Sequence, residues 1–389
     1  MIPRTAAKIA IELSKGYPIV AVTGPRQSGK TTLVRSVFPD KKYLSLEEPD
    51  LLEFALSDPR SFLSRLPDGA ILDEVQRAPS LLSYLQTRVD LDGRQGLFIL
   101  TGSQQFGLLS HITQTLAGRV GMIHLLPFSL EEVGGVGEKN NSLEHWLWTG
   151  FYPPVHDRKL SPSGWYGNYV ATYVERDVRQ LLSIKELTTF RRFIRMCAAR
   201  TGQLVNLSSL GNDCGITHNT VRAWLSVLEA SFILFLVYPH YKNFGKRLVK
   251  TPKLYFYDTG LASWLLGLQG PDSLSIHPLR GSLFESLAIS ELLKGRFNRG
   301  LPSNLFFWRN NSGDEIDVIV EQGDTLIPIE IKSGQTVTMD FFTGLSKWIR
   351  WAGSSAGPPY LIYGGNEDQS RSGIQVLSWK NISRLANEF

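Results

Sequence analysis

A short segment near the amino terminus has the residue types and the spacing of a phosphate-binding loop. Gly24, Gly29, Lys30 and Thr31 stand at the spacing G-x-x-x-x-G-K-[ST]. A glycine-rich loop can turn its backbone N–H groups toward a phosphate at the positive end of a helix dipole. Lys30 then reaches the β- and γ-phosphate oxygens, and the Thr31 hydroxyl ligates Mg²⁺. The sequence therefore predicts an ATP site whose contact residues are Gly24, Pro25, Arg26, Gln27, Ser28, Gly29, Lys30, Thr31 and Thr32.

Two acidic residues follow an apolar run that is typical of a buried strand. Residues 69–72 are glycine or apolar, and Asp73 and Glu74 come directly after them. In open α/β sheets, ligands bind at the carboxyl ends of the strands. Asp73 is therefore expected to bind Mg²⁺ through water, and Glu74 to polarise the attacking water. Acids are also common at helix N-termini, an alternative that the phosphate loop disfavours.

Two further polar residues are candidates for the same centre. The strand expected over residues 97–104 ends in polar residues, of which Ser103 would sense the γ-phosphate, with Gln104 as the second choice. Arg119 follows that fourth strand and would act on transition-state charge as a finger in cis or in trans. The alternative is an ordinary surface arginine. The predicted catalytic residues of this half are Lys30, Glu74, Ser103 and Arg119.

A second group of charged residues lies on two strands expected over residues 315–320 and 327–332. A Gly-Asp pair between them suits a two-residue hairpin loop, and opposed positions then add up to 647. Asp317 faces Glu330 in this register, and Glu315 faces Lys332 on the same side of the sheet. The two facing carboxylates repel by a few tenths to ~1 kcal/mol, which a divalent metal would remove.

Two other features bear on that hairpin. A salt bridge between Lys332 and Glu315, with no chemistry, would explain the same residues. Pro328 within the second strand predicts an edge position or a shifted register, because proline cannot donate to a ladder.

The elements that must position the first group alternate between strand and helix. Strands are expected near residues 19–22, 42–46, 69–72 and 97–104, and helices near 5–15, from about Lys30 onward, and near 50–66. This order predicts an α/β fold with a parallel sheet as the P-loop NTPase core.

The middle of the chain reads as helix, turn, helix, turn, helix, followed by two strands. The helices are expected at 190–201, 206–210 and 217–230, and the strands at 232–238 and 253–257. This is the pattern of a winged helix-turn-helix, whose third helix can contact DNA bases. Similar domains also bind proteins. The candidate DNA contacts are Asn219, Thr220 and Arg222 on the third helix and Lys246, Arg247 and Lys250 in the wing.

Charge is unevenly distributed. The net charge is +5, but residues 185–255 hold 11 Lys or Arg against 3 Asp or Glu, a balance of +8 that leaves −3 elsewhere. A local basic excess is typical of a nucleic-acid interface, although a solvated positive face has the same composition.

Length and composition restrict the class of protein. A chain of 389 residues with 42% hydrophobic and 20% charged residues is typical of a soluble protein of two to three domains. The apolar run at 232–238 is far shorter than the ~20 residues of a membrane span. The first residues lack a signal-peptide pattern, and the two cysteines have no zinc or disulfide spacing. A cytoplasmic location without membrane contact is expected.

The motifs together resemble a known family. They occur in order at residues 24–31, 72–76, 101–103, 118–119 and 126–132, with further matching stretches at 255–262 and 281–285. This set resembles the prokaryotic AAA-type ATPase family with a C-terminal DUF4143 domain. Ser28 stands where the family often has valine. The domains expected are an ATPase core at 1–155, a helical lid or linker at 156–187, a winged helix at 188–275 and the DUF4143 domain at 276–389.

The last domain resembles the PD-(D/E)xK nuclease fold, which is restriction-endonuclease-like. A Glu on a preceding helix, an Asp on one strand and Glu-x-Lys on the next carry this resemblance. It implies that Asp317 and Glu330 bind Mg²⁺ or Mn²⁺, that Glu285 assists, and that Lys332 orients or activates water. Such folds also persist as nucleic-acid binding platforms, so cleavage stays open.

The function predicted is that of a Mg²⁺-dependent ATPase whose nucleotide state controls DNA engagement, with nuclease activity open. One alternative is a nucleotide-gated scaffold that binds a protein partner and carries an inert nuclease-like domain. Another is a nuclease regulated by its ATPase core. The sequence leaves open whether the protein forms a homo-oligomer.

Overall fold

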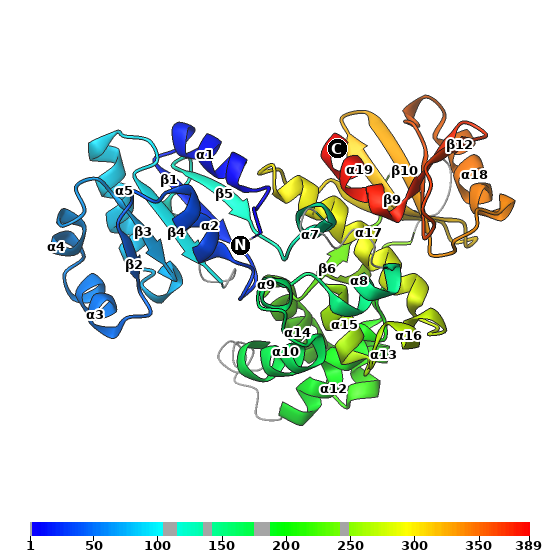
Figure 1. Cartoon of the computed structure of the whole chain (residues 1–389), viewed down its shortest axis with the longest axis horizontal. Coiled ribbons are helices and arrows are strands. Elements are labelled where there is room, and N and C mark those ends of the chain that lie inside the picture. The colour runs from blue at the N-terminus through cyan, green and yellow to red at the C-terminus, as the bar shows by residue number, and fades with distance from the viewer. Residues whose placement is uncertain (1, 104–114, 135–141, 175–186, 242–248) are drawn as a thin grey trace. The chain divides into compact units, whose positions relative to one another are not determined.

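The computed structural model describes residues 2–103, 115–134, 142–174, 187–241 and 249–389 (Figure 1). Backbone contacts divide the chain into two compact units. Unit 1 comprises Met1–Phe128, Ala230–Phe232 and Phe297–Leu301, and unit 2 comprises Ser129–Glu229, Ile233–Arg296 and Pro302–Phe389. None of the described helices is both long enough and apolar enough to cross a membrane.

Unit 1 contains a five-stranded, wholly parallel sheet with the order β2-β3-β4-β1-β5. Its strands are β1 (Ile19–Thr23), β2 (Tyr43–Ser45), β3 (Ala70–Asp73), β4 (Phe98–Gly102) and β5 (Val120–His124). Its helices are α1 (Ala7–Gly16), α2 (Lys30–Val37), α3 (Pro49–Ser57), α4 (Pro59–Ser64), η1 (Val75–Arg77) and α5 (Leu81–Asp92). The expected α/β core with a parallel sheet is confirmed.

Both faces of this sheet are buried, which explains why its strands are almost continuously apolar. Ile19 and Ala21 of β1 belong to a core that also contains residues of α3, α4 and α5. The alternate residues Val20 and Val22 belong to a second core with α1 and α2. The sheet therefore lies between two helical layers, and its carboxyl edge is left for the loops.

One helix expected in unit 1 is two helices. Residues 50–66 fold as α3 and α4, which are separated at Asp58. Pro59 prevents the first helix from continuing, since proline disfavours the helical conformation of the residue before it. The Asp58 carboxylate accepts a hydrogen bond from the Ser61 backbone N–H at 3.0 Å and caps the second helix.

Unit 2 begins with several short helices. They are α7 (Leu130–Gly134), α8 (Leu143–Thr149), α9 (Pro153–Asp157) and α10 (Pro162–Tyr169), followed by a π-helical turn, η2 (Val170–Val174). The helical lid or linker expected at 156–187 is described as far as Val174 and again from Leu187. Proline at the first positions of α9 and α10 starts these helices.

The winged helix-turn-helix elements are present. The three helices are α12 (Leu187–Ala198), α13 (Leu207–Cys214) and α14 (His218–Ala230), and the antiparallel strands are β6 (Leu234–Val237) and β7 (Lys253–Phe256). Thr217 caps the third helix, because its hydroxyl accepts the Thr220 backbone N–H at 3.2 Å. Two short helices, α15 (Thr259–Leu265) and α16 (Pro271–Ser275), lead to the long helix α17 (Arg280–Phe297).

A mixed six-stranded sheet with the order β12-β13-β11-β10-β9-β8 forms the end of unit 2 (Figure 1). Its strands are β8 (Leu305–Arg309), β9 (Glu315–Gln322), β10 (Thr325–Lys332), β11 (Tyr360–Tyr363), β12 (Gln369–Arg371) and β13 (Ile374–Ser378). The remaining helices are η3 (Met339–Phe342), α18 (Thr343–Ala352), η4 (Gly353–Ser355), η5 (Trp379–Asn381) and α19 (Ile382–Glu388).

The predicted hairpin register is confirmed, but the interpretation of Pro328 is wrong. Thr325 pairs with Gln322 and Ile329 with Val318, so opposed positions add up to 647 as expected. Pro328 nevertheless lies in β10, which has β9 and β11 on its two sides. The ladder to β11 begins at Ile329, one residue later, so no bond of that ladder needs the missing proline N–H.

Candidate functional site

The phosphate loop connects β1 to α2 at the carboxyl edge of the parallel sheet of unit 1. Gly24 and Gly29 have φ angles of 152° and 90°, which L side chains rarely adopt. The Lys30 ammonium is buried and donates to the carbonyl oxygens of Gly24 at 3.1 Å and Pro25 at 2.8 Å. The Lys30 ammonium therefore already lies inside the loop that is predicted to bind phosphate.

Arg4 supports this loop from a distance in sequence. Its guanidinium donates to the Ser28 carbonyl at 2.6 Å and to the Leu126 carbonyl at 2.7 Å. It also lies 4.8 Å from the centre of the Phe128 ring. Sequence reasoning missed this residue, because nothing in its own neighbourhood indicates a partner 122 positions away.

The position of Gly24 in the loop leaves no room for a side chain. A Cβ atom at Gly24 would lie 2.1 Å from the Leu125 carbonyl oxygen. We expect Gly24→Ala to lower the free energy of unfolding of unit 1 by ~1–3 kcal/mol, because backbone must move to relieve the overlap. Thermal unfolding with and without ATP measures this. Gly16→Ala is the control, since a Cβ there meets nothing within 4 Å; an equal loss in both variants would contradict the explanation.

Asp73 at the end of β3 accepts three hydroxyl groups. Thr31 donates to its Oδ2 at 2.9 Å and Tyr43 donates to the same atom at 2.6 Å, while Thr101 donates to Oδ1. Burial, together with the hydrogen bond to Asp73, raises the pKa of Tyr43 above its usual value, so the phenol stays a donor. The structure thus brings the two predicted metal ligands, Thr31 and Asp73, into direct contact. Sequence reasoning missed Tyr43 and Thr101.

Glu74 has a left-handed backbone, with φ 57° and ψ 44°, directly after β3. This conformation is unfavourable for a residue with a side chain and clusters at functional sites. Its Oε2 accepts the Ser103 hydroxyl at 3.1 Å and the Gln76 side-chain amide. The structure therefore brings Glu74 and Ser103 together, as expected from neighbouring strands, and adds Gln76. Gln104 lies outside the described residues.

Arg119 lies at the other edge of the sheet. It precedes β5, and its carbonyl accepts the backbone N–H of Ile19 at the start of β1 at 3.2 Å. The phosphate loop follows the far end of β1, about 13 Å away. The guanidinium binds both oxygens of Asp90, at 2.6 and 2.9 Å. The geometry does not support a finger on the phosphates of the same chain, and the trans alternative stays a prediction.

The second predicted group forms the carboxylate cluster, which consists of Glu285 on α17, Glu315 and Asp317 on β9, and Glu330 on β10. Strands β9 and β10 stop pairing after Ile329 and Val318, and the Asp317 carboxylate instead accepts the Ile331 backbone N–H at 2.8 Å. Lys332 contacts Glu330 at 2.5 Å and lies 4.0 Å from Asp317. The expected pair of Lys332 with Glu315 is therefore wrong, because the strands diverge before they reach these residues.

Glu315 and Glu285 have a different partner, which sequence reasoning missed. Lys253 on β7 contacts Glu315 directly, Glu285 at 3.0 Å and Asp317 at 3.9 Å. Arg309 binds the other oxygen of Glu315 at 3.0 Å. Burial raises the pKa of Glu330 to about 8 and that of Glu285 to about 7. Among the described residues, no group of three or more His, Cys, Asp or Glu side chains could hold a metal ion.

The metal site expected from Glu285, Asp317 and Glu330 is therefore not supported. The expectation rested on the repulsion between facing carboxylates, which a cation must relieve. In the folded chain two lysines and one arginine supply that charge. The prediction could not include Lys253, which lies 32 positions before Glu285 on another element.

The candidate DNA contacts are only partly described. Asn219, Arg222 and Lys250 are exposed, while Thr220 is half-buried. The Thr220 hydroxyl is 2.9 Å from that of Thr217, so it contributes to the cap of α14. Lys246 and Arg247 lie outside the described residues.

One face of α14 lines a hollow of about 710 Å³ beside β6. His218, Arg222, Glu229 and Tyr238 are among its lining residues. Burial raises the pKa of Glu229 to about 7, from an ordinary value of 4.5. The folded state therefore holds a proton on Glu229 over a pH range in which the unfolded chain has lost it.

This pKa predicts a pH dependence. Between pH 4.5 and about 7 the folded state binds more protons, so the free energy of unfolding falls as the pH rises through this range. We expect Glu229→Gln to reduce the fall by ~1–3 kcal/mol. Denaturant titrations at pH 5 and pH 8 measure it, with the exposed Glu367→Gln as control. An unchanged pH dependence in Glu229→Gln would contradict the assignment.

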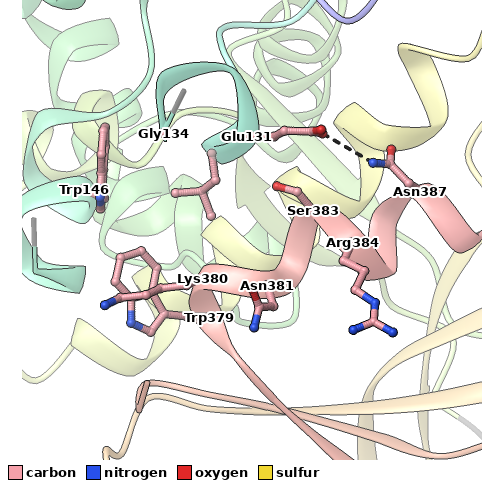
Figure 2. Close-up of a pocket in the computed structure, with 10 residues that line it drawn as sticks. Glu131, Gly134, Trp146, Trp379, Lys380, Asn381, Ser383, Arg384 and Asn387 are labelled. Carbon is pink, nitrogen blue, oxygen red and sulfur yellow. Dashed lines mark hydrogen bonds between the residues drawn. The ribbon is translucent and has the colours of Figure 1, made fainter. Parts of the chain in front are cut away.

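A separate hollow of about 660 Å³ lies between α7, α8 and the segment formed by η5 and α19 (Figure 2). Asn387 on α19 donates to Glu131 on α7 at 3.3 Å across it. Trp146 and Trp379 line one part, and Arg384 lies toward the other. The described residues that line it include none of the predicted site residues, so it belongs to neither group.

The chain is similar to known proteins over most of its length. Family models match an AAA domain at residues 16–134, the domain of unknown function DUF8612 at 140–272, and the domain of unknown function DUF4143 at 280–382. Two curated relatives are the uncharacterized proteins Rv2008c of Mycobacterium tuberculosis and Mb2031c of Mycobacterium bovis. Each is 31% identical over 321 residues, which cover 82% of this chain and 71% of the relative.

The chain also matches solved structures that share little sequence with it. The Walker-type ATPase PABY2304 of Pyrococcus abyssi is 16% identical with a TM-score of 0.45, covering 67% of this chain and 94% of that one. AMPPCP-bound DnaA of Aquifex aeolicus is 16% identical with a TM-score of 0.31, covering 58% of this chain and 85% of that one.

Proposed function

We propose that this chain, which belongs to the family of AAA-domain proteins with a C-terminal DUF4143 domain, binds ATP at residues 24–32 and hydrolyses it. Its N-terminal domain is an AAA-type ATPase domain. The observation that carries the assignment to this edge of the sheet is the convergence of Thr31, Asp73, Glu74 and Ser103 beside the phosphate loop.

The residues present fit a magnesium ion. The Thr31 hydroxyl and the Asp73 carboxylate are 2.9 Å apart, and oxygen atoms of these two types are ligands that Mg²⁺ takes in nucleotide sites. These two residues would hold the ion. When bound, Mg²⁺ neutralises charge that develops on the β- and γ-phosphate oxygens. Tyr43 and Thr101 keep the Asp73 carboxylate oriented toward Thr31.

The other residues have separate roles in this proposal. Lys30 gives up its bonds to the carbonyls of Gly24 and Pro25 and binds phosphate oxygens. Glu74 orients and polarises the attacking water, and Gln76 and Ser103 hold its carboxylate in place. Arg4 binds the Ser28 carbonyl and so holds the backbone of the loop in place.

We also propose that the nucleotide state controls DNA engagement by the winged helix. Support comes from the local charge balance of +8 over residues 185–255 and from the exposed Asn219 and Arg222 on α14. Phosphate contacts release counterions, so affinity for duplex DNA should fall steeply with salt. A gel shift across a salt series, with and without ATP, measures this, and Arg222→Ala should weaken binding. Salt-independent binding would contradict phosphate contacts.

A second function is favoured by one observation. Lys253 and Lys332 pair with acids of the carboxylate cluster, as expected if this domain binds no catalytic metal. The chain would then be a nucleotide-gated scaffold for a protein partner or a second copy of itself. ATPase turnover with and without duplex and single-stranded DNA, in Mg²⁺ and in Mn²⁺, separates the two. Stimulation by DNA supports the first function, and turnover indifferent to DNA supports the second.

The same assay tests the nuclease. DNA recovered on a gel after incubation should be intact. Cleavage that disappears in Asp317→Ala, while ATP turnover persists, would establish a nuclease. It would refute the proposal that the nuclease-like domain is inert.

A further inference from the structure

The ammonium of Lys253 lies among three of the four acids of the carboxylate cluster. It contacts Glu315 directly, Glu285 at 3.0 Å and Asp317 at 3.9 Å. The side chain is 4% exposed. A buried charge of this kind persists only where partners compensate it. Lys253 is therefore part of the packed interior of unit 2.

Further hydrogen bonds engage two of the cluster's acids. Tyr255, on the same strand as Lys253, donates to the Glu285 oxygen that Lys253 contacts. The second oxygen of Asp317 accepts the Ile331 backbone N–H. Among the described atoms, only Oε2 of Glu330 is buried without a hydrogen-bond partner in this group.

The balance of charges in the cluster also disfavours a bound cation. Four carboxylates face three cations, namely Lys253, Lys332 and Arg309, which leaves one negative charge. The three cations thus offset most of the charge of the four acids without any bound ion. A divalent cation entering it would have to displace an ammonium group from carboxylates that already pair with it.

We propose that the Lys253 ammonium takes the place of a divalent cation in the carboxylate cluster, so that the folded chain holds no metal there. Glu285, Asp317 and Glu330 lie on α17, β9 and β10, the helix and two strands on which the nuclease resemblance rests. The lysine comes from β7, the second strand of the winged-helix hairpin. That strand thus closes the site with Lys253 and Tyr255, and removal of Lys253 exposes carboxylate oxygens to a hard cation.

Metal binding to the full-length chain tests the first half of this proposal. The background carries Asp73→Asn, which removes the carboxylate expected to bind metal in the ATPase site. Mn²⁺ is titrated without nucleotide and free Mn²⁺ is followed by electron paramagnetic resonance. We expect Asp317→Asn to leave the titration unchanged. A bound Mn²⁺ that is lost on Asp317→Asn would overturn the proposal.

Replacement of the lysine tests the second half. Lys253→Met in the same background is expected to gain one Mn²⁺ per chain, and Asp317→Asn should abolish the gain. Lys347→Met is the matched control, because it removes a surface lysine that pairs with Asp314 at 3.0 Å in the same unit. If Lys253→Met fails to fold, Lys253→Met with Glu315→Gln carries the same test, since it removes both partners of one ion pair. A folded variant that gains no Mn²⁺ would show that the lysine does not hold a cation's place.

These measurements do not depend on ATP hydrolysis. A chain that hydrolyses no ATP could still show the predicted gain of Mn²⁺, and an active ATPase could fail to show it. The two proposals can therefore fail separately.

Discussion

Lys30→Ala is expected to reduce ATP turnover by about 10²–10³-fold, the typical loss when one preorganised donor to developing charge is removed. Lys30 is buried at the start of α2, and its ammonium already lies within hydrogen-bonding distance of two loop carbonyls. Phosphate oxygens bound in the loop would take over these bonds. The charge therefore acts on the phosphates at short range.

The same variant should keep its fold. Loss of the two bonds to loop carbonyls removes neutral partners that can bind water instead, at about 1 kcal/mol each. Turnover is measured by phosphate release, and thermal unfolding reports the fold. Lys15→Ala is the matched control, since Lys15 is exposed in the last turn of α1. Turnover equal to that of the unchanged protein would refute the ATPase assignment.

Glu74→Gln is expected to lower kcat by about 10²–10⁴-fold while ATP binding is retained, because it removes a general base but keeps the size of the side chain. The structure explains why the position matters. The left-handed backbone of Glu74 directs its carboxylate toward Ser103 at the next strand end. A glutamine side chain at this position can still accept the hydrogen bond from the Ser103 hydroxyl, but it cannot accept a proton from water.

Kinetics distinguish this role from a structural one. A base that acts in the transition state changes kcat and kcat/KM together, whereas a residue that only binds substrate changes KM. Titration with a fluorescent ATP analogue should give a similar Kd for Glu74→Gln and for the unchanged protein. Glu53→Gln, at an exposed position of α3, should leave both parameters unchanged. An unaltered kcat in Glu74→Gln would show that Glu74 is not the general base. Another residue near Ser103 would then have that role.

The phosphate loop and the parallel core could be predicted from sequence because local patterns determine them. Gly24, Gly29 and Lys30 occupy one short segment, and the conformation of that segment depends on its own glycines and on the helix that follows. The register of β9 and β10 follows for the same reason. A tight turn at Gly323 sets the pairs of the hairpin that form, from Gln322 with Thr325 to Val318 with Ile329.

The helical boundaries show where local reasoning was incomplete. Residues 50–66 have an apolar pattern typical of one helix, yet Asp58 and Pro59 divide it. Both residues are visible in the sequence, and their capping chemistry predicts the break. Pro328 is the opposite case, because its tolerance depends on where the neighbouring strand β11 begins.

The amino-acid sequence by itself determined which side chains could carry chemistry and which secondary structure would hold them: the loop around Lys30, the acids after β3 and the pairing of the C-terminal hairpin. Only the tertiary structure decided their partners. Arg4 reaches the loop, Arg119 pairs with Asp90, and Lys253 enters the carboxylate cluster. The physical reason is that a long side chain binds whichever opposite charge or carbonyl the folded chain brings within about 3–4 Å. That proximity depends on the path of distant elements, which no local pattern encodes.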